Sequence, residues 1–331
     1  MVAGVILVAL VVYTLTGGAD FGGGVLDLFA RGKTGSAQRK VIDNAIGPVW
    51  EANHVWLILV IVLMFVCFPR AFAAVSTVLH IPLTLMLIGI VLRGTAFVFR
   101  HYDQPRWHHS WSRVFALASV WTPFFLGVSL GAVASGSFAF DATGHVQSNF
   151  VSEWLAPFPL SVGAFTVALF TLLGATYLTV EAEEADVREA FRSRALVAAV
   201  VTAGCAYVSL ALAASGAPSL FTDLTQHVWS WGFQALTLAL GTGLSASLWS
   251  RRYKMARVLV VLLVVAVELG WAASHVPYIL PPDLTLADAA APRNILVNTL
   301  RLLAIGSVVL VPSFVVLYRV FKGPRFWSLS Q

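Results

Sequence analysis

Three polar side chains stand at the start of an apolar segment at residues 48–68. Glu51, Asn53 and His54 precede a run that is long enough to cross a membrane, for which about 20 residues are needed. An acid costs roughly 2.5–3.5 kcal/mol at the centre of a spanning helix on insertion scales. Such groups usually face a bundle interior or a water-filled path. This segment is therefore where chemistry is expected.

The composition is that of a chain dissolved in lipid. It has 331 residues, of which 58% are hydrophobic and 11% are charged, with a mean hydropathy of +0.82. Soluble domains carry about 25% charged residues. We expect an all-α, polytopic integral membrane protein with a single transmembrane domain over residues 1–331. Nine transmembrane helices are expected, at residues 1–29, 48–68, 75–99, 112–136, 157–180, 195–215, 226–249, 256–275 and 295–320.

Basic residues mark one side of this expected topology. Seventeen of the 21 Lys and Arg residues fall in alternate loops and in the C-terminal tail: Arg31, Lys33, Arg39, Lys40, Arg100, Arg106, Arg113, Arg188, Arg192, Arg194, Arg251, Arg252, Lys254, Arg257, Arg319, Lys322 and Arg325. The positive-inside rule then predicts that the N-terminus lies outside and the C-terminus in the cytoplasm. The net charge of +5 reflects this orientation and does not indicate nucleic-acid binding. The start at Met1–Leu15 lacks a basic leading region, which favours a retained first span over a signal peptide.

Glycines interrupt the first expected span around a second carboxylate. Gly17–Gly24 surrounds Asp20, and glycines let another backbone or a rigid cofactor approach closely. A tight helix contact explains the glycines but does not require a carboxylate. Because consecutive spans tend to be neighbours, we expect Asp20 and Glu51 to form a two-step carboxylate ladder from the cytoplasm. Desolvated carboxylates of this kind relay protons near neutrality.

Each polar residue also has a structural interpretation. Glu51 suits a helix N-terminus in contact with interfacial water, and Asp20 suits a structural hydrogen bond. Arg93, near the cytoplasmic end of its span, is expected to snorkel to the surface. Glu268 is interpreted as the buried partner of a histidine or as part of an outward-leading polar path. The roles of three polar residues stay open: Glu268, His80 and His275.

No metal or haem site is expected in this chain. Glu51 and His54 form one Glu-x-x-His pair, but a di-iron bundle needs a second copy and two further Glu residues. The sequence has no second copy. Its four methionines and scattered histidines offer no convincing axial pair for haem, and it has no Cys-x-x-Cys-His motif. Cys67 and Cys205 are expected to be small packing residues.

Four segments together resemble subunit II of the cytochrome bd-type ubiquinol oxidases. The motifs stand at residues 18–24, 47–58 and 174–178, and residues 293–317 are similar to the last span of that family. The resemblance covers essentially the whole chain, and the motif at 47–58 is highly specific. It implies a nine-helix subunit, with two four-helix bundles plus one peripheral helix, that pairs as a heterodimer with a related, haem-bearing subunit I.

The resemblance also implies a function. The pair of subunits would oxidise quinol at the outer face of the bacterial cytoplasmic (inner) membrane and reduce oxygen to water, drawing protons from the cytoplasm. Haem b and haem d, or b-type haem alone, are expected in subunit I and none in this chain. Accessory single-span subunits, membrane lipids and a bound quinone or lipid are further expected partners. The expected proton path is Asp20, Glu51, Asn53 and His54, and the expected subunit-packing residues are Gly22, Gly24, Trp50 and Trp56.

The chain departs from the family pattern at several positions. Gly17 stands where some members have a further Asp, and Val98 where many have a carboxylate. His54 and His80 occupy positions that often hold other polar or aromatic residues. The proton path is therefore expected to be shortened or rerouted, and the electron donor need not be ubiquinol.

Two other functions fit part of the pattern. A secondary transporter would use a glycine-broken span and intramembrane carboxylates, but only the first span is clearly interrupted. A purely structural membrane scaffold would use the same polar groups to lock helix packing.

Overall fold

The computed structural model describes residues 1–46, 50–102, 105–141, 144 and 146–322. Residues 47–49 of the motif at 47–58, and Arg325 and Trp327, lie outside this range. Within it the protein is almost entirely helical, as the sequence predicts. The helices are α1 (Val2–Asp27), α2 (Gly35–Ile46), α3 (Trp50–Cys67), α4 (Pro69–Val78), α5 (His80–Tyr102), α6 (Pro105–Ala134), α7 (Pro157–Glu181), α8 (Ala185–Gly216), α9 (Pro218–Gln226), α10 (Val228–Trp249), α11 (Tyr253–His275), α12 (Leu286–Ala289) and α13 (Arg293–Lys322).

Eight of the described helices are long and apolar enough to cross a membrane: α1, α3, α5, α6, α7, α8, α11 and α13. A bilayer core contains no water, so each backbone polar group must be paired within the protein, which a helix achieves by itself. Membrane helices tolerate internal prolines where the freed backbone groups find other partners. Pro123 of α6 and Pro312 of α13 are such internal prolines. Helix α10 lies in the place of the seventh expected span but is less apolar than the other eight.

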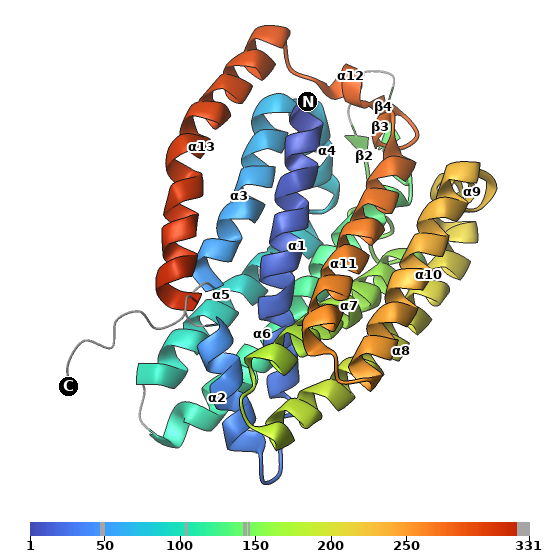
Figure 1. Cartoon of the computed structure of the whole chain (residues 1–331). Helices are drawn as coiled ribbons and strands as arrows, with labels where there is room; N and C mark the ends of the chain where they lie inside the picture. The colour runs from blue at the N-terminus through green and yellow to red at the C-terminus, as the bar shows by residue number, and fades with distance from the viewer. Residues whose placement is uncertain (47–49, 103–104, 142–143, 145, 323–331) are drawn as a thin grey trace.

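The long helices pack in two groups (Figure 1). Helices α1, α3, α5 and α6 form the first bundle, and α7, α8, α10 and α11 form the second. The bundles meet where α7 packs against both α1 and α6. Helix α13 stands apart, touches α3 only lightly, and has none of its apolar window buried.

Helix α1 is continuous, so the expectation that glycines break the first span was wrong. Its hydrogen-bonded helix runs through Gly17–Gly24 without interruption. The glycines instead allow close packing: a Cβ on Gly22 would lie 1.8 Å from the Phe170 carbonyl oxygen, and one on Gly174 would lie 2.7 Å from the backbone of α1. A helix in lipid keeps its backbone paired, and the missing side chains serve the contact between α1 and α7.

Two short hairpins close one end of the molecule. The strands are β1 (Ala139–Phe140) with β2 (Val146–Gln147), and β3 (Tyr278–Leu280) with β4 (Leu284–Thr285), both antiparallel. Figure 1 shows β2, β3, β4 and α12 at the same end as the N-terminus, and α2 at the opposite end.

Candidate functional site

Asp20 lies at the centre of the first bundle in a buried ion pair with Arg93 of α5. The guanidinium Nη2 donates to Asp20 Oδ1 at 2.7 Å, and Nη1 donates to Oδ2 at 3.0 Å. Both side chains are only 2% exposed. The expectation that Arg93 snorkels to the surface was therefore wrong. A buried carboxylate without a counter-charge is very costly, and the bidentate fork of arginine satisfies both of its oxygens.

Helix α6 completes the surroundings of Arg93. Its Nε donates to Ser119 Oγ at 2.9 Å, and Ser119 donates in turn to the Phe115 carbonyl oxygen. The guanidinium carbon lies 4.7 Å from the ring centres of both Phe21 and Phe115. Close approach requires Gly24, where a Cβ would lie 2.1 Å from Ser119 Oγ. The pair thus joins α1, α5 and α6.

Glu51 and Asn53 have different environments at the start of α3. Glu51, in the first turn, is exposed. Asn53 is 1% exposed, and its Nδ2 donates a long hydrogen bond of 3.4 Å to the Thr16 carbonyl oxygen. Within the described residues, no hydrogen bond or ion pair joins Glu51 to Asp20. The structure thus places Glu51 at the rim and Asn53 and Asp20 inside.

His54 contacts α1 from α3. Its ring lies edge-on to Tyr13 at 6.3 Å and is roughly stacked on Phe21 at 6.2 Å. His54 Nδ1 and the Tyr13 hydroxyl are both buried and have no hydrogen-bond partner among the described residues. Buried polar groups of this kind normally bond to ordered water. Phe21 touches both His54 and Arg93, so the histidine adjoins the ion pair through one aromatic ring.

The C-terminal end of α1 carries a second buried carboxylate, Asp27, which the sequence analysis did not single out. Asp27 Oδ1 accepts from Arg39 Nε at 3.0 Å, and its Oδ2 accepts from Arg100 Nη1 at 3.1 Å. Asp43 of α2 also pairs with Arg100. The spacing was a usable signal: Asp20 and Asp27, like Arg93 and Arg100, are seven residues apart and share a helix face.

The four expected subunit-packing residues all contact helices of this same chain. Gly22 and Gly24 pack against α7 and α6, as described above. The Trp50 ring lies 5.6 Å from Phe97 of α5, and the Trp56 ring stacks on Phe314 of α13 at 5.4 Å. Contacts of these residues with a second subunit stay a prediction.

The three residues whose roles stayed open lie away from the Asp20–Arg93 pair. Glu268 of α11 is hydrogen bonded to Thr14 of α1, so it links the two bundles. His275 Nδ1 contacts the Trp271 carbonyl oxygen at 2.8 Å, and His80 Nδ1 contacts the Thr77 carbonyl oxygen at 2.9 Å. Glu268 thus pairs with a hydroxyl and not with a histidine. Among the described residues no three His, Cys, Asp or Glu side chains gather as a metal site.

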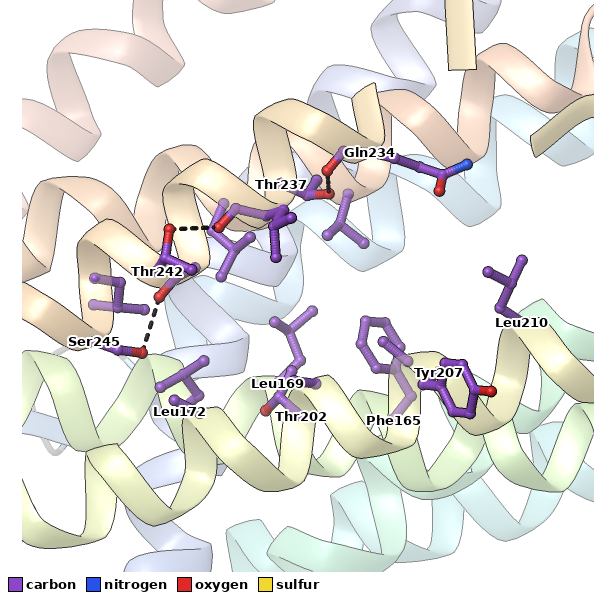
Figure 2. A pocket seen from close by; sticks show the side chains of 18 of the residues that line it. Phe165, Leu169, Leu172, Thr202, Tyr207, Leu210, Gln234, Thr237, Thr242 and Ser245 are labelled. Carbon is purple, nitrogen blue, oxygen red and sulfur yellow. Dashed lines mark hydrogen bonds between the residues drawn. The ribbon is translucent and has the colours of Figure 1, made fainter. Parts of the chain in front are cut away.

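The second bundle contains an open groove of about 950 Å³ between α8 and α10 (Figure 2). Its floor is formed by α7 and α11, and α9 contributes Leu224 at one end. The lining is mostly apolar. Its hydroxyls Thr237, Thr242 and Ser245 donate to carbonyls of their own helix, whereas the buried Thr202 hydroxyl has no partner among the described residues.

The fold and these motifs define a polytopic membrane subunit, and comparison with known proteins assigns it to a family. A family model described as cytochrome bd terminal oxidase subunit II matches residues 1–321. The chain therefore belongs to the family of cytochrome bd terminal oxidase subunit II. Members of this family are multi-pass proteins of the bacterial inner membrane, and the eight apolar helices agree with that localisation.

Individual relatives support this assignment. The chain is 29% identical over 210 residues to cytochrome bd-I ubiquinol oxidase subunit 2 of Escherichia coli (strain K12), which is 62% of this chain and 53% of that protein. It is 22% identical over 325 residues to the putative cytochrome bd menaquinol oxidase subunit II of Bacillus subtilis (strain 168), covering 95% and 92% of the two chains. The chain thus spans about half the length of the first of these relatives.

A solved structure shares the fold. The bd oxidase from Geobacillus thermodenitrificans matches with a TM-score of 0.81 at 20% sequence identity, over 97% of each chain. At this identity the likeness establishes the arrangement of helices and carries no residue role.

Proposed function

We propose that this chain is the haem-free subunit II of a bd-type terminal oxidase, which couples quinol oxidation to the reduction of oxygen to water. The family match over residues 1–321 supports the assignment. In this proposal the haems belong to subunit I and supply the electron transfer and oxygen chemistry. The chain itself supports subunit I and conducts protons, and it takes no catalytic step alone.

The proposed proton path begins at Glu51 and leads to Asp20. Glu51 is exposed, so water can exchange protons with it. Asn53 follows within one helical turn, and its side-chain amide is buried against α1. His54 and Tyr13 continue the line of polar groups beside the Asp20–Arg93 pair. The observation that carries the proposal is that buried Asp20 sits next to buried polar atoms that need water partners.

The membrane topology is part of the same proposal. We place α10 as the ninth span because its 22 residues reach about 33 Å at 1.5 Å per residue, enough for a bilayer core of about 30 Å. The excess of basic residues at one set of loops supports an N-terminus outside and a C-terminus in the cytoplasm. Glu51 and Asp27 then lie near the cytoplasm, and the hairpins lie outside.

We place subunit I against the face formed by α3, α5 and α13. Large apolar side chains are exposed along all three helices, among them Ile58 and Phe65, Leu87 and Val91, and Leu302 and Val309. Helix α13 contacts the core through Leu296, Leu300 and Leu303 in its N-terminal part and through the Trp56–Phe314 stack, and its remaining apolar surface is exposed. A helix with so few contacts gains stability from a neighbouring subunit that packs on it. The quinol donor and single-span accessory subunits remain partners of the assembled complex.

The groove between α8 and α10 is the place that we assign to a bound quinone or lipid. Its apolar walls suit a hydrocarbon chain, and its volume lies in the range of roughly 300–1,000 Å³ found for small-molecule sites.

The test compares Asp20→Asn and Glu51→Gln with the unmodified complex. Oxygen-reduction turnover is measured together with the haem content from reduced-minus-oxidised spectra. Glu183→Gln, which removes an exposed carboxylate at the proposed cytoplasmic side, is the control. We expect both site variants to lower turnover with the haems retained. Wild-type turnover in both Asp20→Asn and Glu51→Gln would show that these carboxylates do not form the proton path.

A scaffold role is the second candidate, because the bidentate clamp of Arg93 on Asp20 is also what helix packing requires. In that case Asp20→Asn lowers the yield of assembled complex, while the turnover per haem stays at the wild-type value. The transporter alternative loses its motivation, since α1 is unbroken.

A further inference from the structure

The ion cluster around Asp27 extends from two partly exposed side chains to a buried carboxylate two helical turns from Asp20. Asp27 and Arg100 side chains are 2% and 3% exposed, whereas Asp43 and Arg39 are 29% and 39% exposed. Three ion pairs join the four side chains in series: Arg39 with Asp27, Asp27 with Arg100, and Arg100 with Asp43. The cluster therefore connects accessible carboxylate at Asp43 with buried carboxylate at Asp27.

The two ion pairs form adjacent layers of one structure. Asp27 follows Asp20 by seven residues on α1, which is about 10 Å along the axis at 1.5 Å per residue. Arg100 follows Arg93 by the same interval on α5. Phe115 of α6 bridges the layers, because its ring centre lies 4.2 Å from the Arg100 guanidinium carbon and 4.7 Å from that of Arg93.

The charges of the cluster formed by Asp27, Asp43, Arg39 and Arg100 are balanced, which suits this cluster to a change of protonation. Two carboxylates, Asp27 and Asp43, face two guanidinium groups, Arg39 and Arg100. When Asp27 takes up a proton, the buried Arg100 still faces Asp43, and Arg39, which loses its carboxylate partner, is 39% exposed and can be solvated by water. Arg100 Nε is buried and has no acceptor among the described residues, which is typical of a group beside internal water.

We propose that Asp43 and Asp27 form a proton-uptake route to Asp20 in addition to Glu51. A proton from cytoplasmic water binds the Asp43 carboxylate, moves to Asp27 as Asp43 regains its charge, and moves on to Asp20 as Asp27 regains its charge. Each step is a proton transfer between oxygen atoms, and no electron is exchanged. This inference rests on the proposed function, because the second route delivers protons to Asp20, the buried carboxylate at which the proposed path ends.

The experiment uses the complete complex carrying Asp27→Asn, Asp43→Asn or both changes, with Glu183→Gln as the matched control. Turnover, proton uptake in proteoliposomes and haem content are measured for each. We expect Asp27→Asn to slow both turnover and uptake by about tenfold. This is less than the 10²–10⁴ contributed by a positioned acid or base, because the route through Glu51 remains. Asp27→Glu restores the rate, and added formate restores part of it in Asp27→Ala, where the missing carboxyl group leaves room for a formate ion.

The outcomes separate this inference from the proposed function. If Asp20→Asn slows proton uptake but Asp27→Asn and Asp43→Asn behave like Glu183→Gln, the Asp27 route is wrong and the path through Glu51 stands. If Asp20→Asn also behaves like the control, the proton-path function itself fails.

A structural effect at Asp27 is distinguished by rescue. A loss that formate does not restore, accompanied by lost haem, means that Asp27 only anchors α2 and α5 and overturns the inference. If Asp27→Asn does not assemble, Asp43→Asn decides, because this more exposed carboxylate can be removed with less disturbance. A loss of uptake in Asp43→Asn that formate restores in Asp43→Ala supports the route, and a wild-type rate overturns it.

Discussion

The interior of the first bundle and the groove of the second bundle are built by opposite means. Around Asp20, α1 packs closely against the backbone of α7, and a charged pair that is almost fully buried joins α1 to α5. Between α8 and α10 the helices diverge, and the side chains of the lining are mostly apolar or bonded to their own helix. Both regions lie in spans of similar length, so the difference comes from the side chains.

This difference reflects how helices associate in lipid. Lipid tails are as apolar as leucine, so apolar surface by itself gives no reason for two helices to meet. Small residues and hydrogen bonds provide the association, and α1 has both in Gly22, Gly24 and Asp20. Where such contacts are sparse, as between α8 and α10, a groove open to hydrocarbon remains.

The largest effect is expected from Arg93→Ala. It leaves the Asp20 carboxylate buried without its counter-charge, and loss of one partner of a buried pair costs about 3–5 kcal/mol. Thermal unfolding of the purified complex measures the loss. Arg252→Ala, an exposed position directly before α11, is the control and should change little. Equal stability of the two variants would show that the buried pair does not hold the first bundle together.

A smaller loss is expected from Gly22→Ala. The new Cβ would meet the Phe170 carbonyl oxygen at 1.8 Å, which forces α1 away from α7, and overpacking of this kind costs about 1–3 kcal/mol. Gly4→Ala in the same helix is the matched control, because no atom lies within 4 Å of its added Cβ. The yield of assembled complex and its melting temperature report the effect. A Gly22→Ala protein as stable as Gly4→Ala would contradict the close contact.

The smallest effect, and one of opposite sign, is expected from Gly241→Ala in the groove. No atom lies within 4 Å of the added Cβ, and alanine favours a helix over glycine by roughly 0.5–1 kcal/mol. The same substitution thus destabilises at Gly22 and is neutral or stabilising at Gly241. Melting temperatures measured side by side decide the point, and a destabilised Gly241→Ala would mean that the groove is closed in the assembled protein.

Sequence reasoning located the spans more accurately than the site. Apolar length predicted the long helices, with the expected span at 75–99 divided in the structure between α4 and α5. The same reasoning placed Asp20, Asn53 and His54 inside the membrane but assigned Arg93 to the surface. Snorkelling is the better general expectation for an arginine near a span end, and nothing in the local sequence showed that a carboxylate on another helix would meet it.

By itself the sequence determined that the chain is an all-helical membrane protein with intramembrane carboxylates, because hydropathy and helix periodicity are local properties. Only the tertiary structure decided which charges are paired. Asp20 and Arg93 are 73 residues apart, and their contact depends on how α1, α5 and α6 pack. The tertiary structure also decided that Gly22 serves helix packing and that Asp27 joins Arg39 and Arg100, since each contact brings together helices that the chain order leaves free to arrange.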